Sequence, residues 1–160
     1  LETLLPLNLG QISLMPETFE LGHLGRLPME LLLSILEELP LISLIRFRNT
    51  NRLAHHTVDT MPKFQIIVEQ APQAIRGVLA VQTKVRVTLP SLLKKLRQRH
   101  CDCCGKLAQH LWLPTTSRLC FHCARFGPMP LEKEEIIQRY GLTDEDLMSI
   151  PSFRFVPATF

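Results

Sequence analysis

Four cysteines carry the most constrained chemistry of this 160-residue chain. They form two Cys-x2-Cys pairs, Cys101 with Cys104 and Cys120 with Cys123, and fifteen residues separate the pairs. This spacing is typical of tetrahedral zinc sites, in which four thiolates leave no position for water or substrate. Gly105 follows the first pair and tolerates the positive φ of a tight turn. The pattern therefore predicts a structural Zn²⁺ site.

Other ligand sets remain possible around the same segment. Four further side chains are alternative ligands: Cys103, His100, His110 and His122. We favour the four-cysteine set because it needs no irregular spacing, and one histidine in place of a cysteine is the alternative. Disulfides are less expected, because the chain opens on Leu1 and Glu2 without the basic start of a secretory leader. We therefore expect a cytoplasmic or nuclear protein.

The composition is that of an ordinary globular chain, with 46% hydrophobic and 21% charged residues. The length allows one moderate core, or one core with a small metal-held appendix. No run of about 18 apolar residues occurs, so we expect no transmembrane helix. The formal net charge of +3 is too small to identify a partner.

Charge is unevenly distributed along the chain. The segment 84–99 contains no acidic residue and carries six basic ones: Lys84, Arg86, Lys94, Lys95, Arg97 and Arg99. Acidic residues gather later: Glu132, Glu134, Glu135, Asp144, Glu145 and Asp146. The simpler interpretation of the basic segment is a solvated helix face, and the alternative is a zinc-stabilised nucleic-acid-binding module. Because aromatic residues are sparse in it, base stacking on single strands is not supported. Six basic residues are also a modest footprint, so we do not expect nucleic acid as a partner.

Three short amphipathic helices are predicted between residues 24 and 60. The first starts near Pro28 and ends at Pro40, with leucines and isoleucines at helical spacing. The second is expected to turn Leu44 inward and to expose Arg46 and Arg48 to water. One of residues 49–51 can cap the third helix through an Asn or Thr side chain.

The rest of the chain is also expected to be mainly helical. Helices should open at Pro62, at Pro72 and after Thr88, and the last of these leads to Cys101. Residues 110–113 and 118–120 flank a turn and predict a small β-hairpin between the cysteine pairs. A polar helix ending at Gly141 follows, and Thr143 with Asp146 resembles a capping box.

These elements predict a mainly α fold: a short three-helix module, further helices and a small zinc-clamped β-hairpin. The expected divisions are a loosely ordered lead-in at 1–23, the helical module at 24–60, a helical linker region at 61–100, the zinc-binding knuckle pair at 101–126, and a C-terminal helix and tail at 127–160. We expect no enzyme, because no catalytic motif occurs and the adjacent His55 and His56 near Asp59 are more typical of a protein surface.

The segment from Leu24 to about Val58 resembles the F-box, the three-helix module by which substrate receptors dock on the adaptor of cullin-type ubiquitin ligases. The matching residues are Leu27-Pro28-x-Glu30-Leu31, then Ile35, Leu36, Leu39, Leu44, Phe47, Arg48 and Arg52. Periodicity alone would favour core burial of these leucines, whereas the resemblance favours a face left for a partner.

Later motifs are similar to a group of fungal F-box proteins with a C-terminal cysteine zinc-knuckle region. These motifs are Thr88-Leu89, Cys101 to Gly105, Leu113-Pro114-Thr115 and Cys120 to Cys123, so that the resemblance covers about residues 24 to 148.

The resemblance implies a non-enzymatic receptor subunit of a Skp-cullin-F-box (SCF) ubiquitin ligase. Its partners would be a Skp-type adaptor, through it a cullin, and an unknown protein substrate. The implied partner-binding residues are Leu27, Pro28, Glu30, Leu31, Ile35, Leu36, Leu44 and Phe47. Because the cysteines lie outside this segment, we expect two separable modules.

Overall fold

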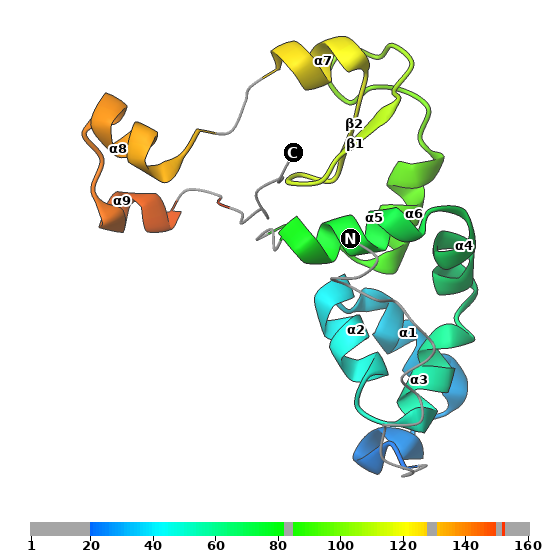
Figure 1. The fold of residues 1–160 in the computed structure, drawn as a ribbon. Helices are drawn as coiled ribbons and strands as arrows, with labels where there is room; N and C mark the ends of the chain where they lie inside the picture. Colours follow the sequence, from blue (N-terminus) through cyan, green and yellow to red (C-terminus); the bar gives the residue numbers. More distant parts are fainter. Residues whose placement is uncertain (1–19, 82–84, 128–130, 150–151, 153–160) are drawn as a thin grey trace.

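The structure is a computed structural model that describes residues 20–81, 85–127, 131–149 and 152 (Figure 1). Residues 1–19 of the lead-in expected at 1–23, and most of the C-terminal tail, lie outside the described residues. The described chain is mainly helical, as predicted, with one two-stranded antiparallel sheet. Its elements are the 3-10 helix η2 (Gly22–Arg26), α1 (Met29–Glu38), α2 (Leu41–Arg48), α3 (Arg52–Asp59), α4 (Pro62–Gln70), α5 (Pro72–Val81), α6 (Leu89–Arg97), β1 (His110–Trp112), β2 (Ser117–Leu119), α7 (Phe121–Phe126), α8 (Lys133–Tyr140) and α9 (Asp144–Ser149).

The helices begin and end where the sequence places prolines and capping side chains. Pro28 directly precedes α1, and its carbonyl oxygen accepts from the backbone N–H groups of Leu31 and Leu32. Asn51 caps α3 by accepting from the Ala54 N–H at 2.8 Å. Thr88 caps α6 in a reciprocal capping box with Ser91.

A single hydrophobic core extends from α1 to α6. Its buried side chains are Leu32, Leu36, Leu41, Leu44, Val58, Met61, Phe64, Ile67, Ile75, Val78, Val87, Leu89, Leu92 and Leu93. This continuity differs from the helical linker that we expected at 61–100. Three short helices leave an apolar side uncovered, and α4, α5 and α6 cover it. Residues 61–96 are therefore part of the same folded unit as the N-terminal helices.

The segment before α6 is attached to the junction between α1 and α2. The Leu41 N–H donates to the Val87 carbonyl oxygen at 2.7 Å, and Arg86 donates to the Glu38 carbonyl oxygen at 2.6 Å. Residues 85–87 form no strand, although their alternating sequence allowed one. These bonds hold the start of α6 against the N-terminal helices.

The β-hairpin packs on the helical core by its apolar side. Strands β1 and β2 form the hairpin that the sequence predicted, and they pair His110 with Leu119 and Trp112 with Ser117. Leu111 and Leu113 contact the core. A side chain at Gly77 of α5 would place its Cβ 2.7 Å from Leu113 Cδ1, so the glycine allows this close approach.

Two helices complete the described chain. Lys133 and Asp144 join α8 and α9 through an exposed ion pair of 2.6 Å, and Gly141 ends α8 with a φ of +64°. In Figure 1 this pair stands apart from the other helices. None of the helices in the described ranges has the length and hydrophobicity that a membrane span requires.

A buried group of charged side chains joins α2 to α3 and corrects two of our expectations. Arg48 and His55 were expected at the surface, but they are only 4% and 3% exposed. Arg48 Nε donates to Asp59 Oδ1 at 2.7 Å, and Asp59 Oδ2 lies 3.0 Å from His55 Nδ1. The shared carboxylate explains the burial, because it satisfies both polar side chains.

Burial in this group also sets the protonation of the histidine. Burial lowers the pKa of His55, the nearby Arg48 lowers it further, and Asp59 opposes both. His55 is therefore neutral near pH 7 and donates its Nδ1–H to the carboxylate. His55 therefore has a structural role between α2 and α3.

Asp59→Ala should destabilise the helical unit by about 3 kcal/mol, because it leaves the buried Arg48 guanidinium without its carboxylate. Urea unfolding followed by far-UV circular dichroism measures the free energy. The matched control is Glu135→Ala, which breaks an exposed ion pair with Arg139 and should change stability by less than about 0.5 kcal/mol. Equal effects of the two substitutions would contradict the structural role of Asp59.

Candidate functional sites: a cysteine cluster and an apolar helix face

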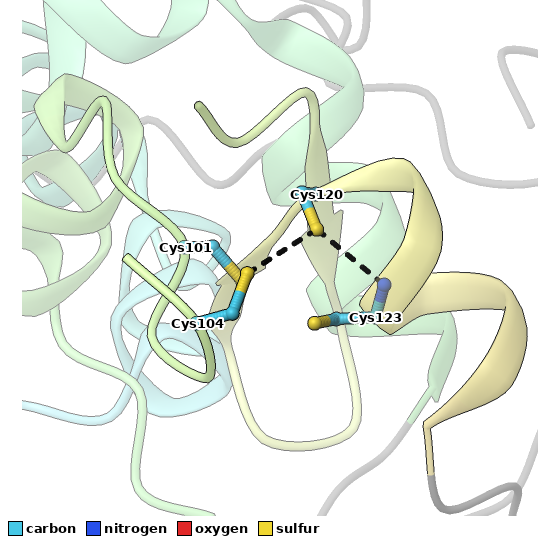
Figure 2. Close-up of side chains that lie close together, drawn as sticks. All are labelled: Cys101, Cys104, Cys120 and Cys123. Atoms are coloured by element: carbon cyan, nitrogen blue, oxygen red, sulfur yellow. Dashed lines mark hydrogen bonds between the residues drawn. The ribbon is translucent and has the colours of Figure 1, made fainter. Parts of the chain in front are cut away.

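The four predicted cysteines converge in the structure. Their Sγ atoms all lie within 4.8 Å of one another, and Cys104 Sγ lies 3.6 Å from Cys120 Sγ. Figure 2 shows Cys101 and Cys104 reaching the cluster from one loop and Cys120 and Cys123 from the start of α7. Zn–S bonds of about 2.3 Å in a tetrahedron place sulfurs about 3.8 Å apart. The arrangement fits a four-coordinate ion, and the cluster could bind a metal.

Local backbone geometry positions each pair of thiols. Gly105 has a φ of +72° and turns the chain after Cys104, as the sequence suggested. Cys120 is the N-cap of α7, and its sulfur accepts from the Cys123 N–H at 3.4 Å. The residues that would hold the metal therefore also start this helix.

The thiols perturb one another because they are close. The pKa of Cys101 falls to about 6: burial raises it, and hydrogen bonds from the backbone N–H groups of Cys104 and Cys120 more than offset that effect. The pKa of Cys123 is raised, mainly because its thiol shares hydrogen bonds with Cys104 and Cys120. A bound cation would stabilise all four thiolates at once.

The alternative ligands lie outside this cluster. Cys103 is exposed, and His100 Nδ1 bonds to the Gly105 carbonyl oxygen at 3.1 Å. The rings of His110 and His122 lie tilted against phenylalanine rings of α7. Among the described residues, the metal-ligating side chains that the structure brings together are the four cysteines.

A network around Asp102 ties the cysteine loop to α6, and the sequence analysis missed it. Lys95 Nζ donates to both carboxylate oxygens of Asp102 at 2.8 Å, and Gln98 Nε2 donates at 2.7 Å. The Arg118 N–H of β2 donates to the same carboxylate at 2.7 Å. Bonds from Gln98 and Lys95 lower the Asp102 pKa to about 2, so it stays ionised. The only sequence signal was an acid beside the first cysteine.

This network also changes the interpretation of the basic segment. Lys95 is paired with Asp102 and Arg86 with a backbone carbonyl, so both serve the fold. Lys94, Arg97 and Arg99 are exposed, and Lys84 lies outside the described residues. Fewer basic side chains are therefore available to form the continuous basic face that a polyanion would need.

The second candidate site is an apolar face of α1. Leu31 is 55% exposed and Ile35 is 47% exposed, and Pro28 is exposed one helical turn before Leu31. Positions 28, 31 and 35 lie on one side of a helix. Met29 is also 52% exposed, and the sequence analysis did not single it out.

The other predicted partner-binding residues are distributed between the surface and the core. Glu30 is exposed, and Leu27 and Phe47 are half-buried. Leu36 and Leu44 are 2% and 0% exposed, so they support the face from beneath and do not lie on it. Helical periodicity marks both sides of α1 as apolar and does not say which side the core covers.

Comparison with known proteins identifies this part of the chain. The family model for the F-box domain matches residues 24–66, which are 43 of the 160 residues. Residues 24–66 therefore form an F-box domain, and the match reaches into α4, beyond the boundary at residue 60 that we expected. Neither the curated proteins nor the solved structures give a match.

Proposed function

We propose that the chain is a substrate-receptor subunit of an SCF-type ubiquitin ligase, which acts in the cytoplasm or nucleus. F-box domains generally serve adaptor-binding subunits and not enzymes, and ubiquitin transfer would occur in the partner subunits. The observation that carries the proposal is the exposed pair Leu31 and Ile35 on α1, within the matched domain. Exposed apolar side chains aligned on one helix face are typical of a docking surface.

The docking face fits a Skp-type adaptor, and through it a cullin. Pro28 presets the entry into α1, while Leu31 and Ile35 supply apolar contact area. Buried Leu36 and Leu44 hold α1 and α2 in place beneath this face. The proposed contacts therefore rest on a core that does not need the partner in order to form.

We further propose that the ion held by the cysteines is Zn²⁺ in a structural role. Four thiolates suit zinc and leave it no open position. The closed ligand set argues against metal-assisted catalysis. We also place the chain with the fungal F-box group. The order of its C-terminal motifs supports this: the knuckle from Cys101 to Gly105, the turn Leu113-Pro114-Thr115 and the knuckle from Cys120 to Cys123.

Adaptor binding is tested by co-expressing the full chain with a Skp-type adaptor and measuring affinity by calorimetry. Leu31→Ala with Ile35→Ala should weaken binding at least about thirtyfold, because truncating a well-packed interface anchor costs about 2 kcal/mol. Leu107→Ala is the matched control, since Leu107 is 63% exposed on the cysteine loop, and it should leave the affinity unchanged. An unchanged affinity of the folded double variant, or no complex with the wild type, would refute the docking face.

Metal content provides a separate test. The purified chain should carry one zinc ion, which Cys101→Ser or Cys120→Ser should remove and Cys103→Ser should retain. Structural zinc contributes about 10 to 16 kcal/mol of apparent binding free energy in small fingers, so a chelator should unfold the hairpin. Elemental analysis of the native protein decides the point. Absence of zinc, or equal loss from all three variants, would exclude this site.

A further inference from the structure

The outer side of α7 carries a continuous group of exposed rings and one cation, which we call the α7 face: His110, Phe121, His122, Arg125 and Phe126. All five side chains are exposed, and Phe121 and Phe126 are 59% and 67% exposed. None of these five side chains belongs to the proposed docking face of α1 or to the cysteine cluster. A helix of six residues that turns two phenylalanines to solvent needs an explanation other than folding.

Ring contacts and cation–π contacts connect these five residues in one line. The rings of His110 and Phe121 are 6.3 Å apart, and those of His122 and Phe126 are 5.0 Å apart. Between them, the Arg125 guanidinium lies 6.0 Å from the Phe121 ring centroid and 5.5 Å from that of Phe126. These distances are within the range of cation–π attraction. The guanidinium is therefore held over the rings before any partner binds.

A metal ion bound by the cysteine cluster would fix the α7 face in place. Cys120 caps α7 and Cys123 lies in its first turn, so the thiols occupy the inner side of the helix. Phe121 with Arg125, and His122 with Phe126, are spaced four residues apart and share the outer side. The Phe121 N–H also donates to Gln109 Oε1 at 3.1 Å, which anchors α7 to the hairpin.

Charge indicates what the face would bind. Residues 103–127 contain no Asp or Glu, and the neighbouring Asp102 is already bonded to Lys95, Gln98 and Arg118. Four thiolates and Zn²⁺ would carry a formal charge of −2, but the thiols are on the inner side of α7. Among the described residues, no carboxylate pairs with Arg125, so the outer side offers a guanidinium beside two exposed phenylalanine rings. A carboxylate can pair with this guanidinium in a bidentate manner.

We propose that the α7 face is the substrate-binding surface, and that it takes a peptide segment with Asp or Glu next to an apolar anchor residue. Aromatic residues and arginine are enriched at the centres of protein interfaces. A nucleic acid is a weaker candidate, because Arg125 is the only Lys or Arg in the line and strand binding requires a track of cations. The inference rests on the proposed receptor function, since it names the substrate chemistry of that receptor.

Selection of random twelve-residue peptides displayed on phage, with the zinc-loaded full chain as bait, tests the proposal. We expect enriched peptides to contain at least two acidic residues beside Leu, Ile or Phe. The affinity of a synthetic enriched peptide should fall at least about tenfold in Phe121→Ala with Phe126→Ala, and also in Arg125→Glu. Tyr140→Ala, which truncates a 61% exposed ring on α8, is the matched control and should bind normally.

Several outcomes would overturn the proposal. These are enrichment of peptides without acidic residues, a peptide affinity that the α7 variants leave unchanged while they retain zinc, and tighter binding of oligo(dT) than of any peptide. Absence of enrichment would also overturn it. An Arg125-dependent dimer in size exclusion would then show that the face holds a second copy of the chain. Altered hydrogen exchange of α8 in the Phe126→Ala variant would show that it holds the chain's own acidic helices.

Failure of this inference can be separated from failure of the proposed function. Peptide selection uses the chain without the adaptor, and the Leu31→Ala with Ile35→Ala variant should bind the peptide as well as the wild type does. If the adaptor binds and no acidic peptide does, only the α7 face is refuted. If acidic peptides bind and no adaptor does, the receptor function is refuted and the α7 face remains as a peptide-binding surface.

Discussion

Helix α6 is the element on which the rest of the structure depends, because it belongs to two parts of the molecule. Its buried leucines, Leu89, Leu92 and Leu93, complete the core of the F-box helices. Its polar side carries Lys95, which together with Gln98 just beyond the helix holds Asp102 of the cysteine loop. The apolar contacts of one side and the charge-assisted bonds of the other join the two regions without a flexible linker. The cysteine hairpin therefore has a defined position relative to the F-box core.

This arrangement gives the chain two outward surfaces at different ends. In Figure 1 helices α1, α2 and α3 lie at one end and α7 at the other, with α4, α5 and α6 between them. On the proposed function, the adaptor would hold the first end and a substrate would occupy the second. Rigid attachment would help such a receptor, because it presents a bound segment at a fixed distance from the ligase without the entropy cost of ordering a linker.

Local sequence signals predicted much of the fold. Prolines, the Asn51 and Thr88 caps and the cysteine spacing act over a few residues, and each has the structural consequence that its chemistry implies. The errors arose where tertiary contacts decide. Arg48 and His55 are buried because Asp59 of α3 interacts with both. His55 lies four residues before Asp59 on the same helix, but Arg48 lies eleven residues away on α2, and its own spacing does not show that partner. The α7 face was missed for a similar reason, since Phe121 and Phe126 follow the cysteines and resemble core residues until their exposure is known.

The central claim is that the F-box helices and the cysteine hairpin form one cooperative unit through α6, in place of the two separable modules that we expected from the sequence. Trp112 in β1 is the single tryptophan of the chain, so its fluorescence reports the hairpin, whereas far-UV ellipticity reports the helices. Urea unfolding of the zinc-loaded chain should give coincident transitions with the two probes, as expected for two-state unfolding. Separate midpoints, with the helices unfolding while Trp112 keeps its native signal or the reverse, would contradict this account.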